Sequence, residues 1–232
     1  MKNKYSTILF DADNTLLDFS KSERISLITT MKDYGVPVTE ENISTYVSIN
    51  DSLWKRLEKK EITKPQLKQI RFRIFFDSIG FNFDGDAFEV NEHYLDLLSQ
   101  CAYTMDGATE LSEKLCKAGY NLYIITNGVA KTQAQRLEKS GLLPFYKGVF
   151  VSEAIGIPKP DKGFFEYVFE KISEKDKSKI IVVGDSLSSD ILGAKNAELD
   201  SIWLNLNNTS LTYNLKPTFT VSDLRKLEKI FF

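Results

Sequence analysis

Residues 5–15 read YSTILFDADNT, a short apolar run that ends in two aspartates. The β-branched and aromatic residues predict a buried strand over residues 5–10, and the polar residues after them predict where that strand stops. In an open α/β sheet, ligands bind just beyond the carboxyl ends of the strands. Asp11 and Asp13 therefore stand where a sheet of this type carries its chemistry.

Further apolar runs later in the chain predict the rest of the sheet: residues 121–125, 148–151, 180–183, 201–204 and, more weakly, 219–221. Segments with a 3.6-residue apolar period lie between several of them and predict helices. Asp106 and Asp161 are expected N-caps of two such helices, and Gly119 is expected to end the first. The alternation of strand and helix predicts an α/β fold with a doubly wound parallel sheet.

Residues 18–100 break this alternation, because they contain several helix starts in succession and no convincing strand. Ser20-x-x-Glu23 and Thr63-x-x-Gln66 both have the form of a capping box. We therefore expect an α/β core made of residues 1–17 and 101–232, with a helical cap of residues 18–100 inserted after the first strand.

Composition excludes several classes of partner. The 232 residues carry 30 Lys and Arg against 32 Asp and Glu, so no basic excess is available for polymeric nucleic acid. No apolar run approaches the 18 residues of a membrane span, and Met1–Lys4 lead directly into the first strand without a signal sequence. We expect a cytoplasmic protein, monomeric or a weak homodimer. Cys101 and Cys116 are expected to be free thiols in or near the core, since His93 is the only histidine available for a zinc site.

Polar residues follow the other strands too. The second ends in Thr126-Asn127-Gly128, the fourth in Gly184-Asp185-Ser186 with Asp190 beyond it, and Lys159 stands before a helix. Parallel strands end at one edge of the sheet, so at least three carboxylates are expected to crowd there and repel one another. Mg²⁺ is the expected neutraliser, because it prefers oxygen ligands and accepts phosphate oxygens in its shell. Together with Lys159 it would receive a phosphate, on which a carboxylate can act as nucleophile.

Four motifs in this order resemble the haloacid dehalogenase superfamily: D-x-D-x-T at residues 11–15, a strand ending in Thr126, Lys159, and G-D-S-x-x-x-D at residues 184–190. The helical insertion resembles the C1 cap of that superfamily. Asn14 departs from the Gly or Asp most common in the first motif, which bears on the turn more than on the chemistry.

The resemblance implies a role for each matched residue. Asp11 would be the nucleophile, and Asp13 the general acid that later activates water as a base. The phosphoryl group would be held by Thr126, Asn127 and Lys159, and Asp190 would orient Lys159 or a water on the metal. The Mg²⁺ ligands would be Asp11, Asp185 and the carbonyl group of Asp13.

A narrower resemblance, to the pyrimidine 5′-nucleotidase branch of the superfamily, extends into the cap and the C-terminal region. It rests on Asn50-x-x-Leu53-Trp54, Thr63-x-x-Gln66-Leu67, Arg71-Phe72 and Trp203-Leu204-Asn205. It implies Mg²⁺-dependent hydrolysis of small phosphate monoesters such as UMP, dUMP and dTMP. The cap candidates for contact with the nucleoside are Asn50, Trp54, Arg71 and Phe72, although an aromatic residue at helical spacing more often packs between helices.

Other functions remain open from the sequence. A sugar-phosphate phosphatase or a phosphomutase would use the same core residues. A phospho-accepting regulatory domain also combines Asp, Thr, Lys and Mg²⁺ on a parallel sheet, but it would not explain the inserted cap. A non-catalytic relative would usually lack Asp11 or Asp13, and a true dehalogenase needs neither a metal nor Asp13.

Overall fold

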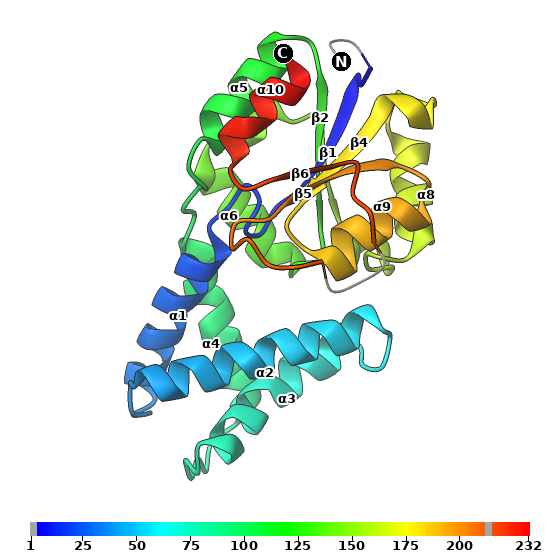
Figure 1. Cartoon of the computed structure of the whole chain (residues 1–232). Helices are drawn as coiled ribbons and strands as arrows, with labels where there is room; N and C mark the ends of the chain where they lie inside the picture. The colour runs from blue at the N-terminus through cyan, green and yellow to red at the C-terminus, as the bar shows by residue number, and fades with distance from the viewer. Residues whose placement is uncertain (1–3, 212–214) are drawn as a thin grey trace. The chain divides into compact units, whose positions relative to one another are not determined.

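The computed structural model describes residues 4–211 and 215–232, and the chain divides into two compact units (Figure 1). The first unit comprises Met1–Phe19 and Ala102–Phe232, and the second comprises Ser20–Cys101. Residues 1–3, which belong to the segment that was expected to carry no signal sequence, lie outside the described residues.

The first unit contains a six-stranded sheet with the strand order β3-β2-β1-β4-β5-β6. Every neighbouring pair of strands is parallel. Each predicted strand is present, which confirms the doubly wound α/β fold. The order reverses between β1 and β4, and this reversal is the switch point at which such sheets bind ligands. The strands are β1 (Thr7–Asp11), β2 (Asn121–Thr126), β3 (Gly148–Val151), β4 (Ile180–Gly184), β5 (Asp200–Leu204) and β6 (Phe219–Val221).

Helices cover both faces of the sheet, with α5 and α10 on one side and α8 and α9 on the other (Figure 1). Side chains alternate across a strand, so Phe10 of β1 packs into one apolar cluster with Leu111, while its neighbour Leu9 packs into another with Phe164. The helices are α5 (Ala108–Lys117), α6 (Ala130–Ser140), α7 (Ser152–Ile155), α8 (Lys162–Lys171), α9 (Leu192–Asn196) and α10 (Glu228–Phe231), with a π-helical turn at Leu187–Ile191 and 3₁₀ turns at Leu143–Phe145, Lys177–Lys179 and Leu224–Leu227.

Two of the three predicted helix boundaries in this unit are confirmed. The Asp161 carboxylate accepts a hydrogen bond from the backbone N–H of Gly163, 2.8 Å away, at the start of α8. Gly119 follows the end of α5 with a φ of 88°, a conformation that glycine adopts without strain. The prediction that Asp106 caps α5 is wrong, because Gly107 occupies the N-cap position with a φ of 80° and none of the described side chains caps the helix.

The second unit consists of helices, and the described residues between 20 and 101 include no strand. A helical insertion after β1 is thus confirmed. Its helices are α1 (Phe19–Asp33, which begins at the last residue of the first unit's leading segment), α2 (Glu40–Glu58), α3 (Lys64–Ser78) and α4 (Ala87–Gln100).

One of the two predicted capping boxes in this unit forms. At the start of α3 the Thr63 hydroxyl accepts from the backbone of Gln66, whose side chain accepts from the Thr63 backbone in return. The predicted box at Ser20 is wrong, because α1 begins one residue earlier and encloses Ser20. Its partner Glu23 is buried and accepts a hydrogen bond from the side chain of Asn50.

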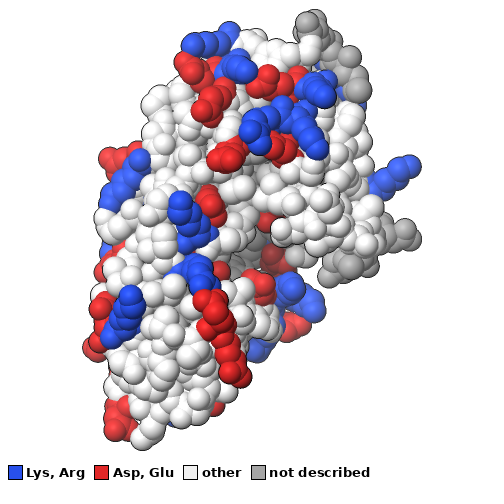
Figure 2. Space-filling model, turned by 60° about the vertical axis from the view of Figure 1, so that its left-hand side comes forward, with Lys and Arg blue, Asp and Glu red and all other residues white. Residues whose placement is uncertain are grey.

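Surface properties agree with the mixed composition. Figure 2 shows basic and acidic side chains interspersed over the visible face, and the described residues there form no continuous area of one sign. Within residues 4–211 and 215–232, no helix is both long and apolar enough to cross a membrane. Both cysteines are free, but Cys116 is exposed, so the expectation that it lies in or near the core is wrong.

The capping box of α3 yields a stability prediction. Replacement of Thr63 by Ala removes the acceptor for the Gln66 N–H, and loss of such a cap costs about 0.5–2 kcal/mol. We expect Thr63→Ala to lower the free energy of unfolding by that amount in urea denaturation followed by circular dichroism. The control is Thr45→Ala in the middle of α2, where the hydroxyl only donates to the Glu41 carbonyl. Equal losses in the two variants would contradict a capping role for Thr63.

Candidate active site

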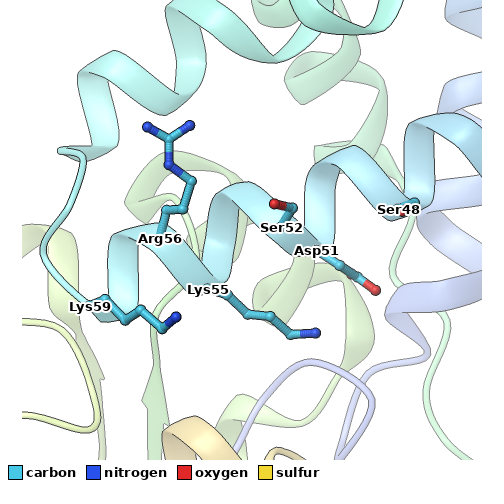
Figure 3. Close-up of a pocket in the computed structure, with 6 residues that line it drawn as sticks. All are labelled: Ser48, Asp51, Ser52, Lys55, Arg56 and Lys59. Atoms are coloured by element: carbon cyan, nitrogen blue, oxygen red, sulfur yellow. The ribbon is translucent and has the colours of Figure 1, made fainter. Parts of the chain in front are cut away.

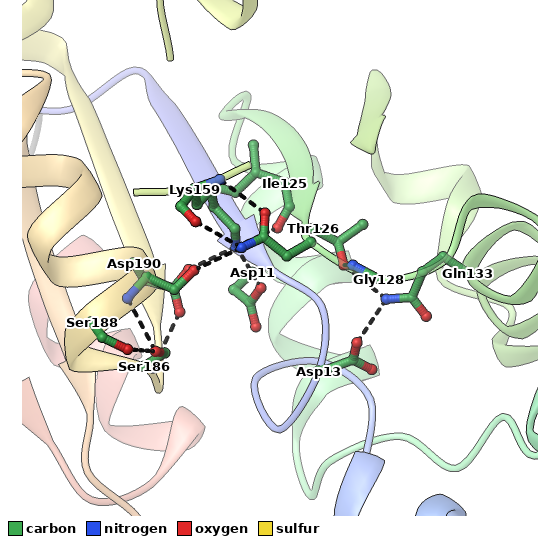
Figure 4. Close-up of polar contacts among 12 residues, drawn as sticks. Asp11, Asp13, Ile125, Thr126, Gly128, Gln133, Lys159, Ser186, Ser188 and Asp190 are labelled. Carbon is green, nitrogen blue, oxygen red and sulfur yellow. Dashed lines mark hydrogen bonds and ion pairs between the residues drawn. The ribbon is translucent and has the colours of Figure 1, made fainter. Parts of the chain in front are cut away.

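A buried lysine joins three parts of the first unit at the switch point. The Lys159 side chain is 1% exposed, and its ammonium nitrogen lies 2.7 Å from Oδ1 of Asp11 and 2.7 Å from Oδ1 of Asp190. It also donates to the carbonyl oxygen of Ile125 at 3.0 Å, so all three of its hydrogens are engaged (Figure 4). The ends of β1 and β2 and the π-helical turn after β4 therefore converge on one cation.

Carboxylates outnumber cations at this centre. Single oxygens of Asp11, Asp185 and Asp190 lie within 4.8 Å of one another, with Lys159 as the ammonium group among them. Burial, reinforced by the Asp190 charge, raises the pKa of Asp11 to about 7. Burial and the charge of Asp11 likewise raise the pKa of Asp185 well above its usual value.

The carboxylates at this centre also favour the charged form of Lys159. Burial alone would lower the pKa of Lys159, but the carboxylates of Asp11 and Asp190 outweigh burial and raise it. The buried carboxylates of Asp11 and Asp190 and the half-buried carboxylate of Asp185 around one ammonium leave a surplus of negative charge that a divalent cation with oxygen ligands would neutralise. The residues at this centre therefore fit a Mg²⁺ ion.

Asp190 is already occupied by contacts within the protein. Its Oδ1 accepts from Lys159, and its Oδ2 accepts from the backbone N–H of Ser186 at 3.2 Å. Gly184 makes room for it, because a Cβ at Gly184 would lie only 2.2 Å from Asp190 Oδ2. These contacts fix Lys159 and leave Asp11 and Asp185 as the side chains better able to face a metal.

The turn that carries Asp185 is held from the neighbouring strand. The indole N–H of Trp203, a buried residue of β5, donates to the backbone carbonyl of Asp185 at 2.8 Å. This contact restrains the backbone of the turn and so limits the positions that the Asp185 carboxylate can take. In the sequence, Trp203 is part of the match to the pyrimidine 5′-nucleotidase branch, and nothing in the sequence predicts its contact with this turn.

Asn127 contacts the backbone of Lys159 on both sides. Its Oδ1 accepts from the Lys159 N–H at 2.9 Å, and its Nδ2 donates to the Lys159 carbonyl at 2.9 Å. This pair of bonds fixes the backbone that carries the lysine side chain. The contact of Asn127 with phosphate stays a prediction, and the contacts observed for its side chain are with the protein.

The first motif forms a tight turn after β1. Asn14 has a φ of 55°, which asparagine tolerates better than most residues, and its N–H donates to the Leu17 carbonyl at 2.7 Å. Asp13, which precedes it, lies near Gln133 and Arg136 of α6, two residues that the sequence analysis missed. Both are polar yet buried, and their three-residue spacing on the helix that follows Thr126-Asn127-Gly128 was the available signal.

Three of the four cap candidates lie inside the helical unit. Asn50 and Arg71 are buried and hydrogen-bonded to each other at 3.1 Å, and Arg71 also donates to the buried Asn91. Phe72 is buried among aromatic rings, and its ring centre lies 5.2 Å from the ring centre of Tyr46. Their contact with substrate stays a prediction, and the contacts observed here are those of helix packing.

The fourth candidate and one hollow lie nearer the surface of that unit. Trp54 is partly exposed, with the Lys64 ammonium 5.8 Å from its ring centre. A hollow of about 380 Å³ runs along α2 (Figure 3), with a polar lining that contains none of the four candidates: Ser48, Asp51, Ser52, Lys55, Arg56 and Lys59.

Comparisons with known proteins agree with this arrangement. Residues 5–198 match the family model described as haloacid dehalogenase-like hydrolase. The chain is 37% identical over 223 residues to the pyrimidine 5′-nucleotidase PynA of Streptococcus pneumoniae, covering 96% of this chain and 93% of PynA. It is 32% identical to the pyrimidine 5′-nucleotidase YjjG of Escherichia coli, with 98% of each chain covered.

A solved structure resembles the whole chain. The magnesium-bound crystal structure of the HAD-hydrolase YfnB from Bacillus subtilis superimposes with a TM-score of 0.92 at 36% identity, covering 98% of this chain and 99% of that one. The parallel sheet and the helices inserted after its first strand therefore have a counterpart in the solved structure of a related hydrolase. By its sequence and by its fold, this chain belongs to the haloacid dehalogenase-like hydrolases.

Proposed function

We propose that this hydrolase is a Mg²⁺-dependent phosphomonoesterase that acts on pyrimidine nucleoside 5′-monophosphates such as UMP, dUMP and dTMP. The observation that carries the proposal is the buried Asp11 carboxylate beside Lys159 at the switch point, with Asp185 close to it. The choice of substrate is supported by the similarity to PynA and YjjG, which are named pyrimidine 5′-nucleotidases.

In the first half of the proposed reaction, an oxygen of Asp11 attacks the phosphorus atom of the ester. The bond from phosphorus to the nucleoside oxygen breaks, and Asp13 donates a proton to that oxygen as it leaves. A bound Mg²⁺, held by Asp11, Asp185 and the Asp13 carbonyl, would supply positive charge to the phosphate oxygens. The Thr126 hydroxyl donates to the same oxygens. Lys159, whose three hydrogens are engaged by the protein, adds positive charge beside the phosphate and keeps Asp11 in place.

In the second half, Asp13 returns as a base. It takes a proton from a water molecule whose oxygen attacks phosphorus, and the bond from phosphorus to Asp11 breaks. Inorganic phosphate leaves, and Asp11 is again a free carboxylate. Two easier displacements at phosphorus, by Asp11 and then by water, replace one difficult displacement by water alone.

The proposed partner is therefore a small phosphate monoester. The absence of polymeric nucleic acid and of membranes among the partners stays a prediction. A cytoplasmic location and a monomeric or weakly dimeric state also stay predictions.

A substrate screen tests the proposed function. We expect phosphate release from UMP, dUMP and dTMP to exceed release from purine nucleotides and from sugar phosphates, with EDTA abolishing activity and added Mg²⁺ restoring it. Equal or faster release from sugar phosphates would replace the nucleotidase proposal by that of a sugar-phosphate phosphatase. Transfer of the phosphate to a second hydroxyl, without net release, would indicate a phosphomutase.

A substitution of Asp11 tests the nucleophile. Asp11→Asn keeps the shape of the side chain but removes its negative charge, so we expect turnover of UMP to fall about 10³-fold or more. Acid quenching of the wild-type reaction with labelled substrate should trap phosphate on Asp11. The control, Asp176→Asn, changes an exposed helix cap and should keep its activity within about twofold, because Asn caps as well as Asp. Labelling of the Asp11→Asn protein would contradict the assignment.

A substitution of Asp13 separates its two proposed steps. Without its acid, Asp13→Asn should release the nucleoside from UMP about 10²- to 10⁴-fold more slowly. An aryl phosphate needs little protonation of its leaving oxygen, so it should still phosphorylate Asp11. Stopped-flow assays should then show a burst of one aryl alcohol per active site, followed by slow turnover. Parallel losses on both substrates without a burst would remove the acid–base role from Asp13.

A further inference from the structure

Two buried side chains of α6 bind the carboxylate of Asp13. Arg136 donates through Nη1 to Asp13 Oδ1 at 2.5 Å, and Gln133 donates through Nε2 to Asp13 Oδ2 at 2.8 Å. Both residues are 1% exposed, whereas the Asp13 side chain is 27% exposed. Each carboxylate oxygen therefore has one protein donor and keeps room for another partner on its open side.

Gln133 has a second contact, with the hydroxyl of Thr126. Thr126 Oγ1 accepts from Gln133 Nε2 at 2.8 Å and from the Gly128 N–H at 3.1 Å (Figure 4). A hydroxyl oxygen has two acceptor positions and one hydrogen, so these two donors occupy both acceptor positions. The Thr126 hydrogen is then available only for donation, which is the form that a phosphate oxygen requires.

The surroundings hold both α6 side chains in these positions. Arg136 Nη1 also donates to Gln133 Oε1 at 3.0 Å, and its guanidinium carbon lies 5.6 Å from the ring centre of Phe19. Gly128 is needed for the close approach of Gln133, because a Cβ there would lie 2.6 Å from Gln133 Cγ and 2.7 Å from Nε2. This pair of residues is thus packed against the backbone of the Thr126-Asn127-Gly128 turn.

We propose that Gln133 and Arg136 are positioning residues for phosphoryl transfer, an inference that rests on the proposed function. They hold the Asp13 carboxylate toward the leaving group, and Gln133 also directs the Thr126 hydroxyl toward the phosphate. One amide group thereby sets the relative position of the proton donor and of a phosphate ligand. A displacement of about 1 Å in such a group can lower a rate about 10²-fold.

The experiment compares leaving groups in the phosphorylation step. Gln133→Ala and Arg136→Met should lower the ratio of the phosphorylation rate with UMP to the rate with an aryl phosphate about 10- to 100-fold. Any change in phosphate binding affects both substrates and cancels in their ratio. The matched control is Gln135→Ala, also in α6, because the described side chains that hydrogen-bond to Asp13 are those of Gln133 and Arg136; this variant should stay within about twofold of wild type.

A double substitution tests the packing against Gly128. Gly128→Ala should displace Gln133 and reproduce the selective loss on UMP. Once Gln133 is also replaced by Ala the collision is gone, so the double variant should be no slower than Gln133→Ala alone. Multiplied losses in the double variant would overturn the proposal, as would equal losses on the two substrates in any folded variant.

The wild-type protein in the same assay separates this inference from the proposed function. A wild type that releases phosphate from neither substrate overturns both. If the wild type is active on both substrates and the variants keep the wild-type ratio of the rates with UMP and with the aryl phosphate, the positioning role is overturned. The phosphatase proposal then stays in place. Thermal melts identify variants that fail to fold, and Gln133→Ala decides the outcome if Arg136→Met is one of them.

Discussion

The ion pairs of Lys159 are the contacts on which the candidate site depends. A buried ammonium between two carboxylates is tolerated only because every partner is in place, and removal of one partner from such a group costs about 3–5 kcal/mol. Asn127 fixes the backbone of Lys159, and the turn after β4 fixes Asp190. Segments far apart in the sequence are therefore held in one arrangement by charge, while the apolar clusters on the two faces of the sheet determine where the strands lie.

The helical unit has its own buried polar group. Glu23, Asn50, Arg71 and Asn91 come from four different helices and are connected by hydrogen bonds in its interior. An apolar contact tolerates sliding, but hydrogen bonds of this kind are satisfied in one register only. The guanidinium carbon of Arg71 also lies 4.8 Å from the ring centre of Tyr94, which adds an attraction between cation and ring. The polar group thus selects one packing of the four helices among those that their apolar faces would allow.

Much of this molecule could be predicted from its sequence, and the reasons are local. The strands are short apolar runs bounded by polar residues, so their positions and the carboxylates at their ends were visible along the chain. The predicted N-caps at Ser20 and Asp106 were wrong because a capping pattern in the sequence does not fix the residue at which a helix begins. The helix α1 already begins at Phe19, and Gly107 is the N-cap of α5. Gln133 and Arg136 were missed because their partner Asp13 is far away in the sequence, and only the parallel pairing of β1 with β2 brings them together.

Gly184 shows how a position without a functional group can control one. A ranking of residues by the chemistry of their side chains would pass over this glycine and select Asp11, Lys159 and Asp190. Yet the space it leaves is filled by the Asp190 carboxylate, which in turn binds the lysine. A larger residue at position 184 would displace the Asp190 carboxylate and, through Lys159, would alter the charges around Asp11, although no charged residue had been replaced. Evolutionary variation of this site is therefore restricted at Gly184, where there is no room for a side chain, as well as at the aspartates themselves.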